Sequence, residues 1–524
     1  MMDSQVYQEI ISEILNKKIV TKDEIHKIKL QFCRKYNLDK VPSDPDILSN
    51  VDEKFYPVLE SVLRKKPVRT ISGVAVVAVM TSPAECPHGK CIYCPGGVEY
   101  GSAQSYTGKE PAALRAGTNN FDPYLQAKSR IEQLGIIGHP TDKIDLIVMG
   151  GTFTSRDIDY QNFFVKRCFD AMNEKNSKSI EEAQKINEKT KHRCIGLTVE
   201  TRPDWCKKEH VDQILRLGGT RVELGIQSTF DSVLKKIERG HTVQDSVDAT
   251  KILKDSGLKV CYHMMPGLPG STKEMDLESF KKIFSDAKFK PDMIKIYPAL
   301  VIKGTKLYDK WKNREYKAPS TEEAAKIIAE IKRIVPRWVR IQRIQRDIPV
   351  GLIEDGVKKS NLRQIVEEEM KKMGGKCHCI RCREVGHKML KGITPDIENT
   401  KLLRTDYDAS RGKEIFLSFE DVKKNILIGY ARLRKTGKPH RKEIKDCMII
   451  RELKVFGQMV PIGEKTENEY QHRGYGKELM KECERITKQE FGYKKILVNS
   501  GVGVRNYYRK IGYRKYGFYM GKKL

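Results

Sequence analysis

The 524-residue chain has no apolar run near the roughly 20 residues that a membrane-spanning helix needs. Its first 18 residues, MMDSQVYQEIISEILNKK, carry acidic residues and a helical period, which a secretion signal does not. Hydrophobic residues make up 39% of the chain and charged residues 32%, the balance of a globular protein. We therefore expect a cytoplasmic protein of two or three domains with no membrane partner.

Acidic residues are scarce relative to basic ones: 69 Asp and Glu face 98 Lys and Arg, a net charge of +29. The chain has no Arg/Gly or Arg/Ser low-complexity tail, so the positive charge must lie on folded surfaces. Such a surplus attracts polyanions and predicts a nucleic-acid partner. A generally lysine-rich proteome is the plainer explanation of part of it.

Cysteine, in contrast, is plentiful, and six of the 13 cysteines form two tight clusters. Cys86, Cys91 and Cys94 lie in ECPHGKCIYCPGG (85–97), and the second cluster lies in GGKCHCIRCREVGH (374–387). Disulfide frameworks belong to small secreted proteins, so clusters in this chain indicate metal binding.

Six short apolar runs alternate with helical patterns after residue 70, at 74–80, 144–151, 195–200, 221–227, 259–267 and 292–298. This spacing predicts an α/β fold with a parallel sheet, specifically a partial (β/α)6 barrel over residues 71–345. In such folds the chemistry gathers at the carboxyl ends of the strands.

The remaining regions have different residue patterns. Residues 1–70 read as a basic, helical N-terminal region, in which Arg64, Lys65, Lys66 and Arg69 either contact phosphate or form a solvated linker. Residues 346–395 form a cysteine-rich linker, and residues 396–524 predict antiparallel strands followed by a long helix, a second α/β domain.

The first cysteine cluster directly follows the first predicted strand. A closed zinc site takes four ligands, whereas three cysteines suit a [4Fe–4S] cluster with one open iron. His88 as a fourth ligand would instead make this a zinc site. Polar or glycine-rich segments end the next three strands: MGGT (149–152), VETRPD (199–204) and ELGIQS (223–228).

This arrangement resembles the radical S-adenosylmethionine enzymes. The resemblance implies that Cys86, Cys91 and Cys94 bind a [4Fe–4S] cluster and that the open iron holds S-adenosylmethionine. It further implies that a group of strand-end residues contacts S-adenosylmethionine: Gly150, Gly151, Glu200, Arg202 and Gln227. The commonest spacing in these enzymes is Cx3CxxC, so Cx4CxxC here indicates a particular branch.

The segment QHRGYG (471–476) matches the Q/R-x-x-G-x-G/A signature of GNAT acetyltransferases. Backbone N–H groups at such a helix start cradle the pyrophosphate of coenzyme A, although a plain loop-to-helix connection looks similar. The resemblance assigns the pyrophosphate to Arg473, Gly474, Tyr475, Gly476 and Lys477, and the pantetheine arm to Glu452, Leu453, Lys454 and Val455. It places Tyr507 and Tyr508 near the thioester sulfur as catalytic candidates, with ordinary core packing as the alternative for one of them.

Together, the two motif sets resemble the Elongator catalytic subunit family, in the archaeal form that works alone. The match runs over residues 70–524, through CPHGKCIYCPGG, DKIDLIVMGGTF, GLTVETRPD, YHMMPGLPGS, QHRGYG and SGVGVRNYYRKIGY. The resemblance implies an enzyme that uses acetyl-CoA and a 5′-deoxyadenosyl radical to place a carboxymethyl group on C5 of the wobble uridine of tRNA. It implies an electron donor, which the sequence does not identify, and a contact of Lys143 with acetyl-CoA.

The second cluster, Cys377, Cys379 and Cys382, has CxCxxC spacing, which favours a structural zinc. His387 is better spaced than His378 as a fourth ligand, and thiols that bind no metal are the alternative interpretation. The oligomeric state is not fixed by the sequence, and a homodimer stays open. Three other functions compete: a protein lysine acetyltransferase that uses Glu452 as general base beside a structural iron–sulfur domain, another radical tRNA-modifying enzyme, and a tRNA-binding scaffold.

Overall fold

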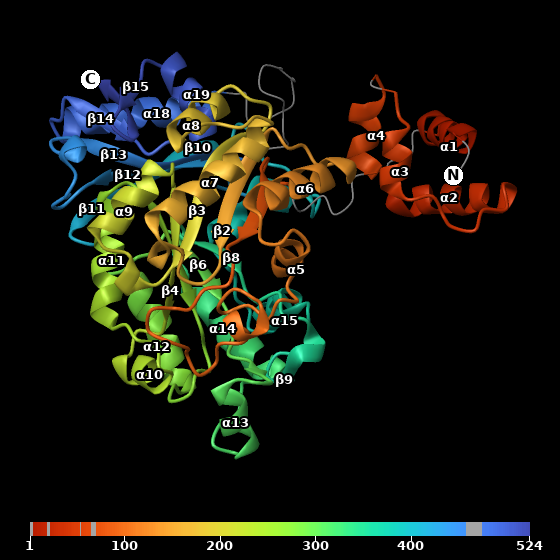
Figure 1. Cartoon of the computed structure of the whole chain (residues 1–524). Helices are drawn as coiled ribbons and strands as arrows, with labels where there is room; N and C mark the ends of the chain where they lie inside the picture. Colours follow the sequence, from red (N-terminus) through yellow and green to blue (C-terminus); the bar gives the residue numbers. More distant parts are fainter. Residues whose placement is uncertain (1–3, 18–20, 53, 64–69, 457–473) are drawn as a thin grey trace.

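The computed structural model describes residues 4–17, 21–52, 54–63, 70–456 and 474–524. Four helices form the N-terminal region: α1 (Ser4–Asn16), α2 (Lys22–Lys35), α3 (Asp44–Ser49) and α4 (Tyr56–Leu63). They enclose an apolar core of their own and stand apart from the main body (Figure 1). The basic segment 64–69 lies outside the described residues. None of the described helices could cross a bilayer.

The first sheet is a parallel partial barrel, as predicted. Its strands run in the order β1-β2-β3-β4-β5-β6-β8. Their bounds are β1 (Ala75–Met80), β2 (Lys143–Met149), β3 (Arg193–Thr201), β4 (Arg221–Gln227), β5 (Lys259–Met264), β6 (Met293–Ile296) and β8 (Arg340–Arg343). The first six match the six apolar runs. The seventh, β8, was missed because RIQR has a single apolar residue.

Helices cover the outer face of this sheet (Figure 1). The helices of this domain are α5 (Pro111–Thr118), α6 (Pro123–Ile136), α7 (Ile158–Asn173), α8 (Ile180–Asn187), α9 (Lys208–Arg216), α10 (Asp231–Lys236), α11 (Val243–Asp255), α12 (Lys273–Ser285), α13 (Lys306–Lys312), α14 (Thr321–Ile334) and α15 (Leu362–Lys372). Of these, α10 and α13 lie beyond the strand ends and pack against the cysteine loop. Local sequence sets many of their starts: the Thr242 hydroxyl accepts from the Asp245 amide and Asp245 accepts from the Thr242 amide, a capping box that begins α11. A short pair, β7 (Val301–Ile302) and β9 (Ile353–Asp355), and two small helices, α16 (Ile380–Arg383) and α17 (Val385–Met389), complete this part.

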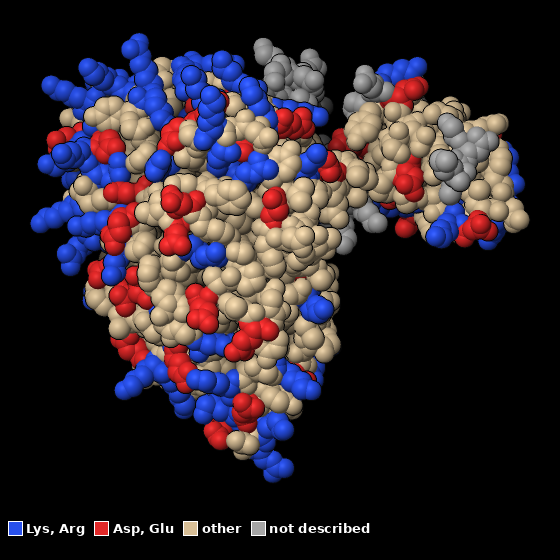
Figure 2. Space-filling view, viewed as in Figure 1, with Lys and Arg blue, Asp and Glu red and all other residues tan. Residues whose placement is uncertain are grey.

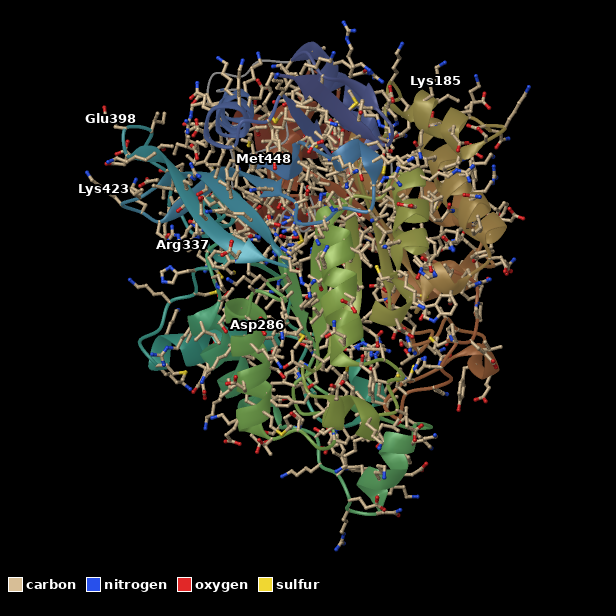
Figure 3. The ribbon with its side chains drawn as sticks, turned by 90° about the vertical axis from the view of Figure 1, so that its left-hand side faces the viewer. Lys185, Asp286, Arg337, Glu398, Lys423 and Met448 are labelled. Atoms are coloured by element: carbon tan, nitrogen blue, oxygen red, sulfur yellow. The ribbon has the colours of Figure 1, made fainter. Side chains whose placement is uncertain are left out.

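The C-terminal domain is a second seven-stranded sheet, in the order β10-β11-β12-β13-β14-β16-β15. Its elements are β10 (Thr400–Ala409), β11 (Gly412–Asp421), β12 (Ile426–Lys435), β13 (Met448–Val455), α18 (Tyr475–Arg485), β14 (Lys495–Val498), α19 (Arg505–Lys510), β15 (Arg514–Tyr516) and β16 (Tyr519–Lys523). All neighbours are antiparallel except β13 and β14, which run parallel. In Figure 3 this sheet lies above the barrel helices, and Glu398 and Lys423 mark its free end.

The two sheets share a hydrophobic core. Ile449, Leu497 and Tyr519 of the second sheet pack in the same buried cluster as the barrel strands. They meet the amino ends of those strands, because the turn before β5 receives hydrogen bonds from Tyr519 and Asn499. The carboxyl ends, where the cysteine loop begins, are therefore at the opposite end of the barrel.

Candidate active site

A pocket opens at the carboxyl ends of the barrel strands. Its lining brings Cys86 together with four of the predicted contacts for S-adenosylmethionine: Gly151, Glu200, Arg202 and Gln227. The Nη1 atom of Arg202 and the Oε1 atom of Gln227 are buried in the pocket wall without a hydrogen-bond partner among the described residues. Unsatisfied buried donors and acceptors carry a free-energy cost, so a polar ligand at this position would stabilise both.

The turn after β2 has a backbone conformation and close neighbours that only glycine fits. Gly150 has a φ of +132°, and a Cβ there would lie 2.0 Å from the Thr81 hydroxyl. Gly151 has a φ of +81°, and its Cβ would lie 3.7 Å from the Cys86 sulfur. Only glycine allows the backbone to take this conformation so close to the first cysteine. The turn therefore presents bare backbone to whatever binds beside Cys86.

Polar groups surround the three thiols of the loop. Cys86 lies 3.5 Å from the Thr152 hydroxyl, Cys94 lies 3.4 Å from the Ser105 hydroxyl, and the buried Arg239 guanidinium donates to the Cys91 sulfur at 3.5 Å. Burial raises the pKa of the Cys86 and Cys94 thiols, so they release their protons when a bound cation offsets the burial.

The same thiols are too far apart for a single ion. A tetrahedral zinc site places its sulfurs about 3.8 Å from one another. Among the described residues, Cys86, Cys91 and Cys94 are not one of the groups whose ligand atoms all lie within 4.8 Å. His88 Nε2 lies 3.1 Å from the Cys91 sulfur. The arrangement fits a multi-iron cluster, in which each thiolate binds a different iron, with His88 as a neighbour of one ligand.

Charged residues form the floor of the pocket. Glu223 pairs with Lys295 and with His263, whose Nε2 lies 2.7 Å away. Burial alone would raise the pKa of the Glu223 carboxyl, but Lys295, His263 and Arg221 outweigh it and hold that pKa well below its ordinary value. The Tyr106 hydroxyl donates to Glu200 at 2.6 Å. These groups form a hydrogen-bonded polar surface in the pocket.

The second predicted site lies in the C-terminal domain, where β13 separates from its neighbour. β13 pairs with β14 only from Met448 to Ile450, but with β12 as far as Val455. One edge of the predicted pantetheine residues 452–455 therefore has no strand partner among the described residues. Free backbone groups along such an edge can hydrogen bond to the amides of a pantetheine arm.

The start of α18 closes this edge. Gly474, with a φ of +87°, caps the helix, and a Cβ on Gly476 would lie 3.2 Å from the Tyr507 hydroxyl and 3.7 Å from the Val455 side chain. The first amides of α18 and its dipole favour an anion here. Tyr475 is buried against Phe419, and Lys477 is exposed. Arg473 lies outside the described residues.

The structure separates the two predicted tyrosines. The Tyr507 hydroxyl lies beside Gly476, at the open edge of β13. Tyr508 is 6% exposed and packs edge-on against Tyr507 and Tyr513 in the domain core. Burial raises the pKa of Tyr507 above its ordinary value, so its hydroxyl stays a donor at neutral pH. The Tyr507 hydroxyl therefore lies at the open edge of β13, whereas Tyr508 packs in the core of the domain.

Two other predicted residues face the boundary between the domains. Glu452 accepts from Arg432 at 2.8 Å; burial opposes ionisation, but Lys259 and Arg432 outweigh it and lower the pKa of the carboxyl. Lys143 begins β2, at the end opposite the cysteine loop, and its strand partner Arg193 approaches Gly503 of the C-terminal domain.

The second cysteine cluster is compact. The sulfurs of Cys377, Cys379 and Cys382 lie within 4.8 Å of one another, close enough for one tetrahedral ion. The three thiols interact, which lowers the pKa of Cys379 and raises the pKa of Cys377 and Cys382, so a bound cation is what would ionise all three. His387 does not belong to this group; burial lowers its pKa to about 4, and its Nε2 has no hydrogen-bond partner among the described residues. The residues fit a zinc ion held through three thiolates.

Sequence reasoning missed several pocket residues: Tyr106, Glu223, Arg239, His263 and Lys295. Three of them share a signal, because Glu223 in VELGI, His263 in VCYHM and Lys295 in MIKI are polar residues inside otherwise apolar strands. A buried parallel strand tolerates such residues only when they face a polar lumen.

Four family models match the chain: the ELP3 N-terminal domain over residues 4–71, the radical SAM superfamily over 82–283, its C-terminal domain over 291–372, and the acetyltransferase (GNAT) family over 387–513. The tRNA uridine(34) acetyltransferase of Methanocaldococcus infernus is 58% identical, over 99% of this chain and 98% of that protein. Elongator complex protein 3 of Homo sapiens is 44% identical, over 98% and 96% of the two chains.

A solved structure agrees with both. The archaeal Methanocaldococcus infernus Elp3 with an N-terminal deletion (1–46) aligns with a TM-score of 0.78 at 56% identity, over 87% of this chain and 100% of that one. The predicted resemblance is confirmed over nearly the whole chain. The chain belongs to the family of archaeal tRNA uridine(34) acetyltransferases and Elongator complex protein 3.

Proposed function

We propose that this enzyme is a tRNA carboxymethyluridine synthase, which joins the acetyl group of acetyl-CoA to C5 of the wobble uridine. The observation that carries the proposal is the presence of a pocket that contains Cys86 and of an open β13 edge in two domains that pack against each other through a shared apolar cluster. The names of the relatives supply the substrate, uridine 34 of tRNA.

The pocket residues fit a [4Fe–4S] cluster and S-adenosylmethionine. When bound, this pair supplies a carbon radical able to remove a hydrogen atom from an unactivated methyl group, which no side-chain base can do. Cys86, Cys91 and Cys94 would hold the irons. The bare backbone of Gly150 and Gly151 and the unsatisfied Arg202 and Gln227 would contact S-adenosylmethionine.

The overall reaction balances. The acetyl methyl loses one hydrogen atom, which leaves on 5′-deoxyadenosine, and the new C–C bond replaces the C5–H bond of the uracil. That second hydrogen leaves as a proton and an electron, while cleavage of S-adenosylmethionine consumes one electron from an external donor. Water then hydrolyses the thioester to release coenzyme A and a carboxymethyl group.

In the C-terminal domain, the edge at residues 452–455 would hold the pantetheine arm and the start of α18 the pyrophosphate. The Tyr507 hydroxyl would donate toward the thioester. Positive charge would hold the tRNA: Lys and Arg crowd the part of the surface formed by this domain (Figure 2). The Cys377, Cys379 and Cys382 cluster would hold a structural zinc.

A protein lysine acetyltransferase is the less favoured reading. It would need a general base near the acetyl group, and Glu452 is the candidate on β13. That carboxylate is tied to Arg432 and has a lowered pKa, which makes it a weak base.

The test incubates the reconstituted full chain with tRNA, acetyl-CoA, S-adenosylmethionine and dithionite, and identifies nucleosides after digestion. We expect 5-carboxymethyluridine only when all four are present. An acetylated product formed without S-adenosylmethionine and reductant would refute the proposal in favour of simple acyl transfer.

A further inference from the structure

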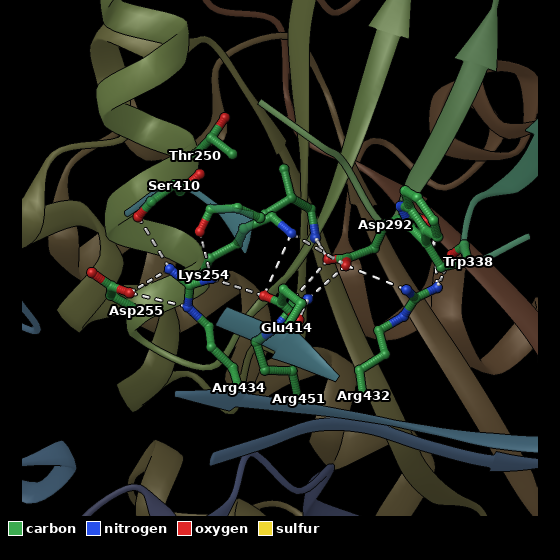
Figure 4. A network of polar contacts seen from close by, with 12 residues as sticks. Thr250, Lys254, Asp255, Asp292, Trp338, Ser410, Glu414, Arg432, Arg434 and Arg451 are labelled. Atoms are coloured by element: carbon green, nitrogen blue, oxygen red, sulfur yellow. Dashed lines mark hydrogen bonds and ion pairs between the residues drawn. The ribbon is translucent and has the colours of Figure 1, made fainter. Parts of the chain in front are cut away.

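Seven charged side chains are completely buried where the barrel meets the C-terminal sheet (Figure 4). Their exposed fractions are all 1% or less. Lys254, Asp255 and Asp292 come from the barrel, and Glu414, Arg432, Arg434 and Arg451 come from the second sheet. We refer to them as the interdomain ion network.

Arg451 is the centre of this network, and each of its five N–H groups is used. Two donate to the Asp292 carboxylate at 2.6 and 2.7 Å, as a fork that grips both oxygens. Two donate to Glu414 at 2.7 and 3.2 Å, and one to the Leu258 carbonyl at 2.9 Å. A guanidinium held this way has one orientation, which a lysine could not reproduce.

Asp292 connects the Arg451 guanidinium to two barrel strands. The Asp292 carboxylate also accepts a hydrogen bond from the Val260 amide of β5 at 2.9 Å, and Asp292 directly precedes β6 in the chain. The opposite ends of β5 and β6 carry His263 and Lys295, which line the cysteine pocket. At about 3.3 Å per residue, Val260 and His263 are about 10 Å apart along one rigid strand.

On the other side, Arg451 belongs to the strand that holds the second site. It is the residue before Glu452, where the open edge of β13 begins. Arg432 reinforces the connection, since it donates to Glu452 at 2.8 Å and to the Trp338 carbonyl of the barrel at 2.7 Å. One set of directional bonds therefore joins the edge of β13 to the two strands beneath the pocket.

Adhesion between the domains does not require these charges. Apolar side chains already pack across the boundary. Burying ion pairs brings little net stability, because desolvation offsets the attraction, and well-packed apolar residues would serve as well. The two hydrogen bonds from Arg451 to Asp292 are directional, so they fix how the two sheets are rotated and shifted relative to one another.

We propose that Arg451 and Asp292 are positioning residues for the coupled reaction, which keep the β13 edge in register with the cysteine pocket so that radical formation leads to a modified uridine. This role rests on the proposed function. Loss of the fork would loosen the strands that join the two sites and displace one site from the other, and displaced reacting groups lose rate steeply.

The first measurement needs no cofactor. Backbone hydrogen exchange is compared in the full-length chain and in Arg451→Met and Arg451→Lys. We expect exchange to rise about tenfold or more in peptides covering 255–264 and 448–455, and to stay unchanged over β2. The matched control is Arg404→Met, since Arg404 forms an ion pair with Asp406 and Glu490 inside the C-terminal domain at its surface.

The second measurement is the number of 5′-deoxyadenosine molecules formed per modified uridine. We expect this ratio to rise about tenfold or more in Arg451→Lys, which keeps the charge, and to stay at the wild-type value in Arg404→Met. The double variant Arg451→Met/Asp292→Leu removes one cation and one anion, so the net charge of the network is unchanged, and we expect the same rise in the ratio.

If the wild-type enzyme modifies tRNA and the ratio is unchanged in Arg451→Lys and in the double variant, the positioning role is overturned and the proposed function stands. So would an unchanged exchange pattern. A wild-type enzyme that forms 5′-deoxyadenosine but no modified uridine would overturn the proposed function, and the positioning role with it.

Discussion

The Arg451 guanidinium lies across both carboxylate oxygens of Asp292, at 2.6 and 2.7 Å, although the residues are 159 positions apart and belong to different sheets. The pair joins the C-terminal sheet to the barrel domain through two side-chain hydrogen bonds. The pair fixes the orientation of the β13 edge relative to β5 and β6, whose other ends line the pocket.

Replacing Tyr507 should affect chemistry, and replacing Tyr508 should affect packing. Tyr507→Phe removes a donor beside Gly476, so we expect modified uridine to form about 10- to 100-fold more slowly with little change in thermal stability. Tyr508→Phe keeps the buried ring and should stay within about twofold of the wild-type rate. Equal losses in the two variants would show that Tyr507 has no special role.

Gly150→Ala should strain the turn that presents backbone to the pocket. The new Cβ would meet the Thr81 hydroxyl in a backbone conformation that alanine avoids, at a cost of about 1–3 kcal/mol. We expect a lower thermal midpoint and a weaker yield of 5′-deoxyadenosine. Gly351→Ala is the control, because a Cβ there has nothing within 4 Å and φ is not positive. Matching behaviour of the two variants would contradict a special role for Gly150.

The compact cysteine cluster should bind one zinc ion per chain. Cys379→Ala removes the central thiolate, so we expect metal analysis to show loss of about one zinc and the thermal midpoint to fall, with iron content unchanged. Cys447→Ala is the matched control, since Cys447 is also buried but does not belong to a metal-binding group among the described residues. Full zinc content in Cys379→Ala would refute the site.

Asp276 should make stability depend on pH. Burial raises its pKa to about 6, while it accepts from the Gly267 amide and the Ser271 hydroxyl in the loop after β5. A carboxyl with a raised folded-state pKa contributes stability at low pH that is lost as pH rises through about 6. Between pH 5 and pH 7.5 the wild type should lose about 1.4 kcal/mol relative to Asp276→Asn, whose amide does not titrate.

Denaturant unfolding of both proteins at the two pH values measures this difference. A difference in unfolding free energy that does not change with pH would show that the Asp276 carboxyl has an ordinary pKa in the folded chain.

The sequence was sufficient to predict the elements that a local residue pattern encodes. The six apolar runs became β1 to β6 because each is long enough to be read as a buried strand, and the cysteine spacing identified the first loop. β8 and β10 were missed, since RIQR and TKLLRTDYDA mix polar and apolar residues; their strand state depends on pairing with distant neighbours.

The site was predicted where a motif names it and missed where only the fold assembles it. The family resemblance named Cys86, Gly151 and Gln227 as strand-end site residues, and the structure brings the three into one pocket. Lys295 and Glu223 are 72 positions apart, and their pairing exists only because β4 and β6 face the same lumen. The interdomain ion network could not be predicted for the same reason, because its partners come from both domains and carry no local signature.

The central claim is that both sites act in one reaction, and isotope transfer tests it most directly. The full chain is incubated with tRNA, S-adenosylmethionine, dithionite and acetyl-CoA that carries three deuterium atoms on its methyl group. We predict that the 5′-deoxyadenosine contains one deuterium and the new carboxymethyl group two. Cys91→Ala should form neither product, while Cys33→Ala, which changes a cysteine of α2, should behave as wild type. Modified uridine that retains all three deuterium atoms, or 5′-deoxyadenosine without deuterium in a reaction that does modify tRNA, would contradict the account.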